Sequence, residues 1–354
     1  MPATDRLHTL VVPSQALASN RFVNCSAPTT CKLTAGSATV PRQRLANGDN
    51  PPVSSPSSPG RADGASNAPH APAAVTHYEN FPVASWLCPP HLRAPIAAIY
   101  HFARTADDIA DEGAATPDER LAELAVYRAD LAAAAHGNGV SARWPQVFGP
   151  LAAVITQFKL PEALLADLLS AFMQDIAWTR DARAYTDRAE LLDYCRRSAN
   201  PVGRLLLHLY GVTGATALAQ SDAICSALQL INFWQDLSVD LPRGRFYLPL
   251  ADCAAHGLSR DDFKQFKPLA PQPPARPAID LVAHEVRWAR ELMQSGAPLV
   301  HALPGRAGWE LRLVAQGGLA ILDKIAAQGF DSYSRRPVVG KADAPRLLWR
   351  AVWM

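Results

Sequence analysis

Apolar residues recur at three- and four-residue spacing along most of the chain beyond residue 76, which is the pattern of amphipathic and buried α-helices. Alternating runs of Val, Ile and Thr, which would indicate strands, are almost absent. We therefore predict one all-α domain over residues 76–354. Its helices are expected at residues 91–112, 118–135, 147–158, 161–179, 188–212, 215–241, 278–300 and 307–329.

Local signals mark some helix ends and one loop. Thr116 is suited to cap a helix that starts with Pro117, because proline needs no hydrogen-bonded N–H at the first helical position. Pro242 ends the helix predicted over residues 215–241. The Pro-rich stretch 267–277 predicts a surface crossing and is too short to separate two domains.

Residues 1–75 differ in composition from the rest of the chain. They are rich in Pro and Ser and show no helical or strand period, so we predict a disordered tail. A misassigned start, with Val75 as the first residue of the native protein, is the alternative. The early Asp5 and the lack of a following apolar run argue against a secretory signal.

Charge and cysteine content exclude several classes of protein. The 354 residues include 34 basic and 32 acidic side chains, a net charge of +2, which argues against nucleic-acid binding. No apolar run is long enough to predict a membrane-spanning helix. The six cysteines form no Cys-x-x-Cys pair, which excludes a zinc ribbon or a disulfide scaffold and predicts free thiols in a reducing, cytoplasmic compartment.

A first acidic motif lies in YHFARTADDIADE, residues 100–112. If this stretch is helical, Arg104, Asp107, Asp108 and Asp111 share one face. Asp107 and Asp111 are then one turn apart, so their carboxylates repel each other unless a cation lies between them. A solvated surface face neutralised by Arg104 is the alternative interpretation.

A second acidic motif lies in QLINFWQDLSVD, residues 229–240. Asn232, Asp236 and Asp240 recur at four-residue spacing, and Gln229 lies just below them on the same helical face. Nearly all other residues of this helix are hydrophobic, so we expect the helix to be buried. Buried carboxylates must be paired or bind a metal.

The two motifs together predict a site for metal and diphosphate. Carboxylate sites without His or Cys favour Mg²⁺, which is usually shared between protein carboxylates and substrate phosphates. Arg104, Arg243 and Arg245 lie close in sequence and would complete a clamp for diphosphate. The chain contains no P-loop motif and no GxGxxG, so other common phosphate sites are not expected.

Apolar helices around such a clamp predict a lipid diphosphate as the substrate. The metal would take up charge on the departing diphosphate, and aromatic rings would stabilise the carbocation left behind. The aromatic residues considered for this role, each of which is also expected as core filler, are Phe81, Trp86, Phe172, Trp178, Phe233 and Trp234.

The motifs YHFARTADDIADE (100–112) and NFWQDLSVDLPRGRFYLP (232–249) resemble the two aspartate-rich signatures of the squalene/phytoene synthase family. The resemblance extends from about His77 to the C-terminus. It implies the isoprenoid synthase fold, an all-α helical bundle around a central cavity. The residues that it assigns to Mg²⁺ are Asp107, Asp111, Asn232, Asp236 and Asp240. The residues that it assigns to phosphate oxygens or to the lining of the reaction cavity are Arg104, Arg245, Tyr100 and Gln229.

Two segments depart from the family pattern. Residues 77–83 read HYENFPV, and Ala199-Asn200-Pro201 stands where the family has an Ala-Gly pair, with Pro201 expected to kink the helix. Both resemble the branch that makes hydroxysqualene in bacterial hopanoid synthesis. In that branch presqualene diphosphate loses diphosphate, the cation rearranges, and water captures it. Phe81 and Asn200 are then expected beside the substrate.

Two alternatives remain open. The enzymatic alternative is head-to-head condensation of two farnesyl diphosphates to presqualene diphosphate, or squalene or phytoene synthase activity. The other is a catalytically silent helical scaffold that binds lipid. A hydrophobic substrate is compatible with peripheral attachment to the inner membrane face, although the sequence identifies no exposed apolar patch. No nucleic acid and no obligate protein partner is inferred.

Overall fold

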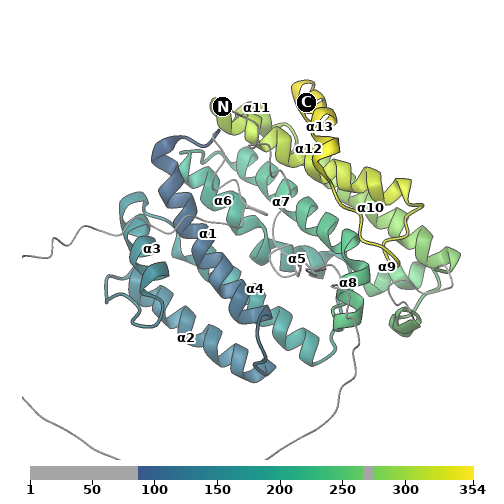
Figure 1. Cartoon of the computed structure of the whole chain (residues 1–354), viewed down its shortest axis with the longest axis horizontal. Coiled ribbons are helices and arrows are strands. Elements are labelled where there is room, and N and C mark those ends of the chain that lie inside the picture. Colours follow the sequence, from purple (N-terminus) through teal and green to yellow (C-terminus); the bar gives the residue numbers. More distant parts are fainter. Residues whose placement is uncertain (1–86, 266–273) are drawn as a thin grey trace, which may run out of the picture. The chain divides into compact units, whose positions relative to one another are not determined.

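The computed structural model describes residues 87–265 and 274–354, and every regular element in these ranges is helical (Figure 1). The all-α prediction is therefore confirmed. The predictions for the tail, for the start at Val75 and for Phe81 and Trp86 lie outside the described residues. In the described ranges, no helix combines the length and the hydropathy needed to cross a bilayer.

The chain forms its helices in the following order. The α-helices are α1 (Pro90–Asp111), α2 (Pro117–Ala135), α3 (Pro145–Phe158), α4 (Glu162–Arg180), α5 (Arg188–Ser198), α6 (Asn200–Leu209), α7 (Ala215–Gln235), α8 (Leu237–Asp240), α9 (Leu250–Ala255), α10 (Arg276–Gly296), α11 (Leu299–Ala302), α12 (Arg306–Ala327) and α13 (Ala344–Val352). The 3₁₀ helices are η2 (Leu241–Arg243), η3 (Arg260–Gln265) and η4 (Lys341–Asp343).

The start of α2 has the geometry that its sequence predicts. The Glu119 N–H donates to the Thr116 hydroxyl at 3.3 Å, and the Thr116 N–H donates to the Glu119 carboxylate at 2.7 Å. Pro117 follows the cap at the first helical position. This reciprocal pair satisfies two N–H groups that have no partner within a helix.

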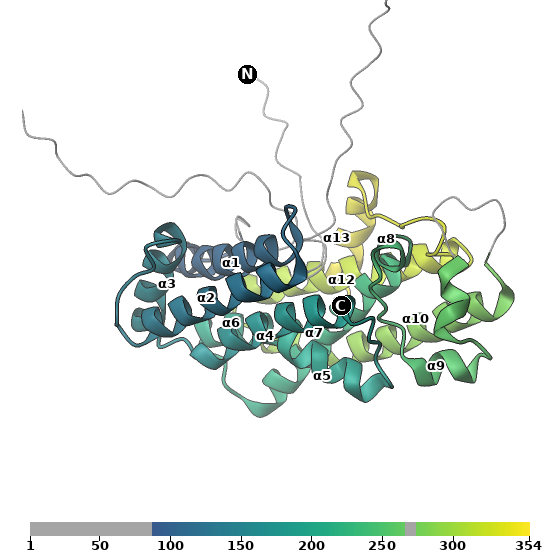
Figure 2. The ribbon, with the colours of Figure 1, turned by 90° about the horizontal axis from the view of Figure 1, so that it is seen from below.

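Helix α7 is the central helix of the described fold. It packs against α10, α6, α12 and α5, while α1 to α4 pack against one another. Figures 1 and 2 show α1 to α4 on one side of α7 and α10 and α12 on the other. The second half of α7 is buried on all sides, and Phe233 and Trp234 are completely inaccessible. The apolar sequence of this helix thus follows from its position between two layers.

Three predicted helices are interrupted, and the one expected over 278–300 divides into α10 and α11. The helix expected over 188–212 breaks at Ala199 into α5 and α6, as the kink predicted at Pro201 requires. The single helix expected over 215–241 is wrong, because α7 ends at Gln235 and α8 starts at Leu237. Here the Ser238 N–H donates to the Ser332 carbonyl oxygen at 3.0 Å, a long-range bond that no local pattern encodes.

Candidate active site

The first acidic motif forms the last two turns of α1. Asp107 is 3% exposed, so the alternative of a solvated face is wrong for this residue. Arg104 donates to Asp107 at 3.3 Å and pairs with Asp108 at 2.6 Å and Glu112 at 2.9 Å. Burial, followed by the nearby charge of Asp111, raises the pKa of Asp107 well above its usual value. The end of α1 therefore holds a buried carboxyl group whose ionisation is disfavoured despite the adjacent Arg104.

The second acidic motif spans the junction of α7 and α8. Asp236 and Asp240 are 0% and 2% exposed, and the Asn232 amide donates to Asp236 Oδ2 at 3.1 Å. Burial, with the adjacent charge of Asp236, raises the pKa of Asp240 to about 8. Several buried polar atoms here make no hydrogen bond within the described structure. They are Asn232 Oδ1, Asp240 Oδ2 and both amide atoms of Gln229.

Arg245 connects the two motifs. It forms an ion pair with Asp111, although 134 residues separate them in the chain. Its pKa is raised by the charges of Tyr247, Asp111, Asp240 and Asp175, which outweigh burial. The carboxylates of α1 and those of the α7–α8 junction therefore surround one guanidinium group. The juxtaposition predicted from the two motifs is present in the fold.

Asp175 of α4 belongs to the same cluster, but the sequence offers no signal for it. Its carboxylate accepts hydrogen bonds from the Tyr194 hydroxyl and, at 3.3 Å, from the Tyr247 hydroxyl. Burial raises the pKa of Asp175 to about 6 against the lowering effects of Arg245 and Tyr194. The Tyr247 ring stacks on Phe233 with centroids 3.9 Å apart. A single aspartate on an apolar helix is recognisable only once the helices are packed.

Arg336 is the other residue that sequence reasoning missed. It forms an ion pair with Asp236 and donates to both carboxylate oxygens. The Asp236 side chain is 1% exposed and that of Arg336 is 25% exposed, so the pair is largely desolvated. The charge of Arg336 is the main factor that opposes the burial-driven rise in the pKa of Asp236. Its segment follows α12 and has no recognisable motif.

The other residues predicted for the site lie on several different helices. Tyr100 is buried on α1, one turn before Arg104. The Asn200 side-chain oxygen, Oδ1, accepts a hydrogen bond from the Ser226 hydroxyl at 2.9 Å, at the contact between α6 and α7. Phe233 and Trp234 are core residues of α7, as the core-filler interpretation has it.

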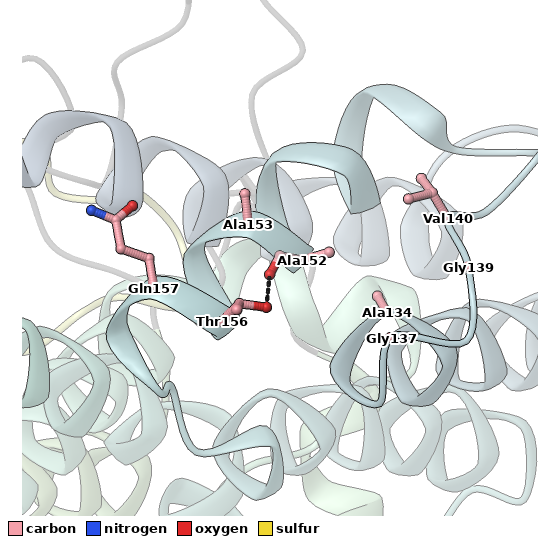
Figure 3. Close-up of a pocket in the computed structure, with 8 residues that line it drawn as sticks. All are labelled: Ala134, Gly137, Gly139, Val140, Ala152, Ala153, Thr156 and Gln157. Carbon is pink, nitrogen blue, oxygen red and sulfur yellow. Dashed lines mark hydrogen bonds between the residues drawn. The ribbon is translucent and has the colours of Figure 1, made fainter.

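One pocket lies apart from these motifs. It has a volume of about 430 Å³ and opens widely to solvent between the end of α2 and α3 (Figure 3). Its lining consists of small or neutral side chains, including Ala134, Val140 and Thr156. It contains no charged group, so nothing in it would recognise a diphosphate.

The aspartate cluster has the donor set of a hard divalent cation. All its ligands are oxygens, at least two of them have no protein partner, and its like-charged groups are buried together. A second group with metal-ligating side chains, Asp252, His284 and Glu285, also contains buried atoms without a hydrogen-bond partner, His284 Nδ1 and Glu285 Oε2. There Arg188 donates to Asp252 at 2.8 Å and to Glu285 at 3.3 Å, so a protein cation already occupies the position. The α1–α7 site therefore offers oxygen donors alone, which fit a hard divalent cation, whereas the group around Arg188 includes a histidine.

Comparison with known proteins agrees with this geometry. The sequence model for squalene/phytoene synthase matches residues 74–343. A hydroxysqualene synthase of Sinorhizobium fredii is 40% identical over 190 residues, 53% of this chain and 61% of the relative. A phytoene synthase of Cereibacter sphaeroides is 31% identical over 283 residues, 76% of this chain and 74% of the relative. The chain thus spans about three fifths of the length of the hydroxysqualene synthase it matches.

A solved structure extends the likeness to three dimensions. The crystal structure of a squalene synthase from Alicyclobacillus acidocaldarius superposes with a TM-score of 0.62 at 36% sequence identity. The match covers 72% of this chain and 90% of that protein. The helical arrangement around the two aspartate motifs is therefore one that a related protein adopts.

Proposed function

We propose that this chain, a member of the squalene/phytoene synthase family, ionises presqualene diphosphate and adds water to the rearranged cation, giving hydroxysqualene and diphosphate. The observation that carries the proposal is the buried cluster of carboxylates, bridged by Arg245, in a chain 40% identical to a hydroxysqualene synthase. Buried carboxylates of this number are costly unless a cation and its anionic ligand join them.

The residues of the cluster fall into two groups, those that would hold the metal and those that would contact the phosphate oxygens. Those that would hold Mg²⁺ are Asp107, Asp111, Asn232, Asp236 and Asp240. When bound, Mg²⁺ supplies positive charge that stabilises the diphosphate as the C–O bond breaks. Arg245 and Arg336 contribute two further cations next to these carboxylates, and guanidinium groups recognise phosphate oxygens through paired N–H donors.

Capture of the cation by water releases a proton, and we assign its acceptance to Asp175. As the water oxygen forms its bond to carbon, one of its protons passes to this carboxylate. A pKa of about 6 makes Asp175 a competent base at neutral pH. Tyr194 and Tyr247 hold both of its oxygens through their hydroxyl groups.

The decisive experiment separates the two substrates. Purified protein with Mg²⁺ is incubated with presqualene diphosphate and, separately, with farnesyl diphosphate, and the lipids are extracted and analysed by mass spectrometry. We expect hydroxysqualene from presqualene diphosphate and no product from farnesyl diphosphate. Conversion of farnesyl diphosphate alone would favour the condensing alternative, and NADPH consumption would indicate a squalene synthase. Asp107→Asn is the inactive control.

A further inference from the structure

Helix α13 presents an apolar surface that no described residue covers. Leu347 and Ala351 face α12 and are buried, but the next two strips around the helix are also apolar. Leu348 and Val352 form one strip, at 48% and 52% exposure, and the tryptophans at 349 and 353 form the other, at 66% and 74%. An amphipathic helix in a soluble protein normally turns polar residues to this side. We call these four exposed residues the α13 face.

Trp309 extends the apolar surface onto α12. It is 45% exposed, and the Arg312 guanidinium lies 5.1 Å from its ring centroid. The same guanidinium donates to the Ala351 carbonyl oxygen at 3.2 Å, so Trp309 lies near the C-terminal end of α13. Figure 1 shows α13 beside α12 at the edge of the described fold. Three exposed indole rings therefore gather at one end of these two helices.

Basic side chains flank this surface. Within α12, η4 and α13 there are six basic residues against three acidic ones, Glu310, Asp323 and Asp343, a difference of +3. On α13 itself Arg346 and Arg350 lie beside the tryptophan strip; they pair with Asp323 of α12 at 3.7 and 2.7 Å, and the Arg346 side chain stays 67% exposed. No acidic residue lies on α13. The electrostatic complement of the α13 face is thus an anionic surface.

We propose that the α13 face docks the protein onto an anionic lipid bilayer, with the exposed tryptophans and Leu348 inserted at the headgroup boundary. Indole rings with flanking arginines are the side chains that favour this boundary. The four exposed side chains offer on the order of 500 Å², less than the roughly 800 Å² per partner of a stable protein interface. A bilayer is therefore a better occupant than a second copy of the chain.

This choice of occupant also rests on the proposed function, because a presqualene-type substrate and its alcohol product are hydrocarbons that dissolve in membranes. The test does not depend on it. Sedimentation with vesicles of phosphatidylglycerol and phosphatidylcholine, without substrate, measures binding directly. We expect binding that weakens as salt increases and is about tenfold weaker or more for Trp349→Gln/Trp353→Gln, since two exposed rings leave the lipid. Arg346→Gln should reduce binding to the anionic vesicles only.

A matched control removes exposed apolar groups elsewhere. Val126→Gln/Val140→Gln changes residues that are 47% and 53% exposed on other elements, and it should bind vesicles as the wild type does. Failure of the wild type to bind at low salt, or equal loss in both double variants, would overturn the proposal. So would a dimer in sedimentation velocity that the tryptophan variant dissociates, because a second copy would then cover the face. Turnover assayed in detergent micelles reports on the proposed function separately.

Discussion

At the residue scale, the buried carboxylates of the site differ in whether a protein cation is paired with them. Asp111 is paired with Arg245 and Asp236 with Arg336, whereas one oxygen of Asp240 has no protein partner. The paired groups lie beside protein cations. Asp240, with its pKa raised to about 8, would be stabilised in its ionised form by a bound metal.

Arg336→Gln tests the pair that the sequence did not reveal. Without the guanidinium, Asp236 is a buried carboxylate opposed only by the Asn232 amide and a more distant arginine. We expect turnover to fall by about 10²-fold or more, comparable with the loss of a preorganised donor in other active sites. Steady-state kinetics at saturating Mg²⁺ would measure it. Arg335→Gln, at the exposed neighbouring position, should retain wild-type turnover, and an equal effect of both changes would contradict the assignment.

Glu285→Gln tests a buried carboxyl outside the site. Burial raises the pKa of Glu285 to about 8 from an ordinary value of 4.5, despite the opposing charge of Arg188. The unfolded chain releases this proton at lower pH than the folded one, so the stability due to this group declines as pH rises from about 4.5 to 8.

The variant carries no such proton. Relative to the wild type, the free energy of unfolding of the variant should therefore increase as pH rises from about 4.5 to 8, by more than about 1 kcal/mol. Above this range the difference should stay constant. Urea unfolding at pH 5, 6.5 and 8 measures the difference. Glu291→Gln, at an exposed position of the same helix, should give a difference that does not vary with pH. If the difference in unfolding free energy between the variant and the wild type instead decreased as pH rises, Glu285 would be ionised and stabilised by Arg188.

At the element scale, α10 packs closely against α7 at Gly296. A Cβ atom at Gly296 would lie 2.5 Å from the Gln220 carbonyl oxygen and 2.6 Å from Ile224 Cγ1. Because the first of these is a backbone atom, Gly296→Ala must push the helices apart. We expect a loss of about 1–3 kcal/mol in unfolding free energy, measured by urea denaturation.

Gly317 provides the matched control for this change. It lies within α12, and an added Cβ would meet nothing within 4 Å. Gly317→Ala should therefore stabilise the protein by up to about 1 kcal/mol, since alanine is the better helix former. Equal effects of the two substitutions would show that helix propensity, and not the contact with α7, governs Gly296.

The helices themselves could largely be predicted from periodicity, but their interruptions could not. The start of α2 follows from Thr116 and Pro117, which act within one turn. The break at Asp236 depends on a partner almost a hundred residues away, the carbonyl oxygen of Ser332, so no window of sequence contains its cause. Helix α13 escaped prediction because nine residues are too few to establish a period.

The residues of the site likewise include some that could be predicted from the sequence and some that could not. Asp107, Asp111, Asp236 and Asp240 come in pairs at four-residue spacing, which sequence displays directly. Asp175 and Arg336 belong to no spaced motif and enter the site only because α4 and the segment after α12 pack beside the paired groups. Residues of this kind can be assigned to the site only from the packing of the helices in three dimensions.

At the scale of the whole molecule, the two helical layers on either side of α7 bring like charges together at the cost of folding stability. α1 contributes Asp107 and Asp111, the α7–α8 junction contributes Asp236 and Asp240, and burial raises the pKa of at least three of these groups. A fold of this kind is more stable when a ligand neutralises the cluster. Stability of the entire domain therefore reports on the site.

The prediction that follows concerns Mg²⁺ with inorganic diphosphate. Together they should raise the melting temperature, by an amount equivalent to about 2.7 kcal/mol when the free ligand exceeds its dissociation constant a hundredfold. Asp107→Asn should abolish this shift and, in EDTA, should melt above the wild type, because it removes a buried charge that burial and Asp111 both disfavour. Asp261→Asn, with a side chain 79% exposed, should keep the full shift. A wild-type protein that shows no shift at millimolar ligand would make the silent lipid-binding scaffold the better explanation, since a scaffold has no use for a site that only a metal diphosphate relieves.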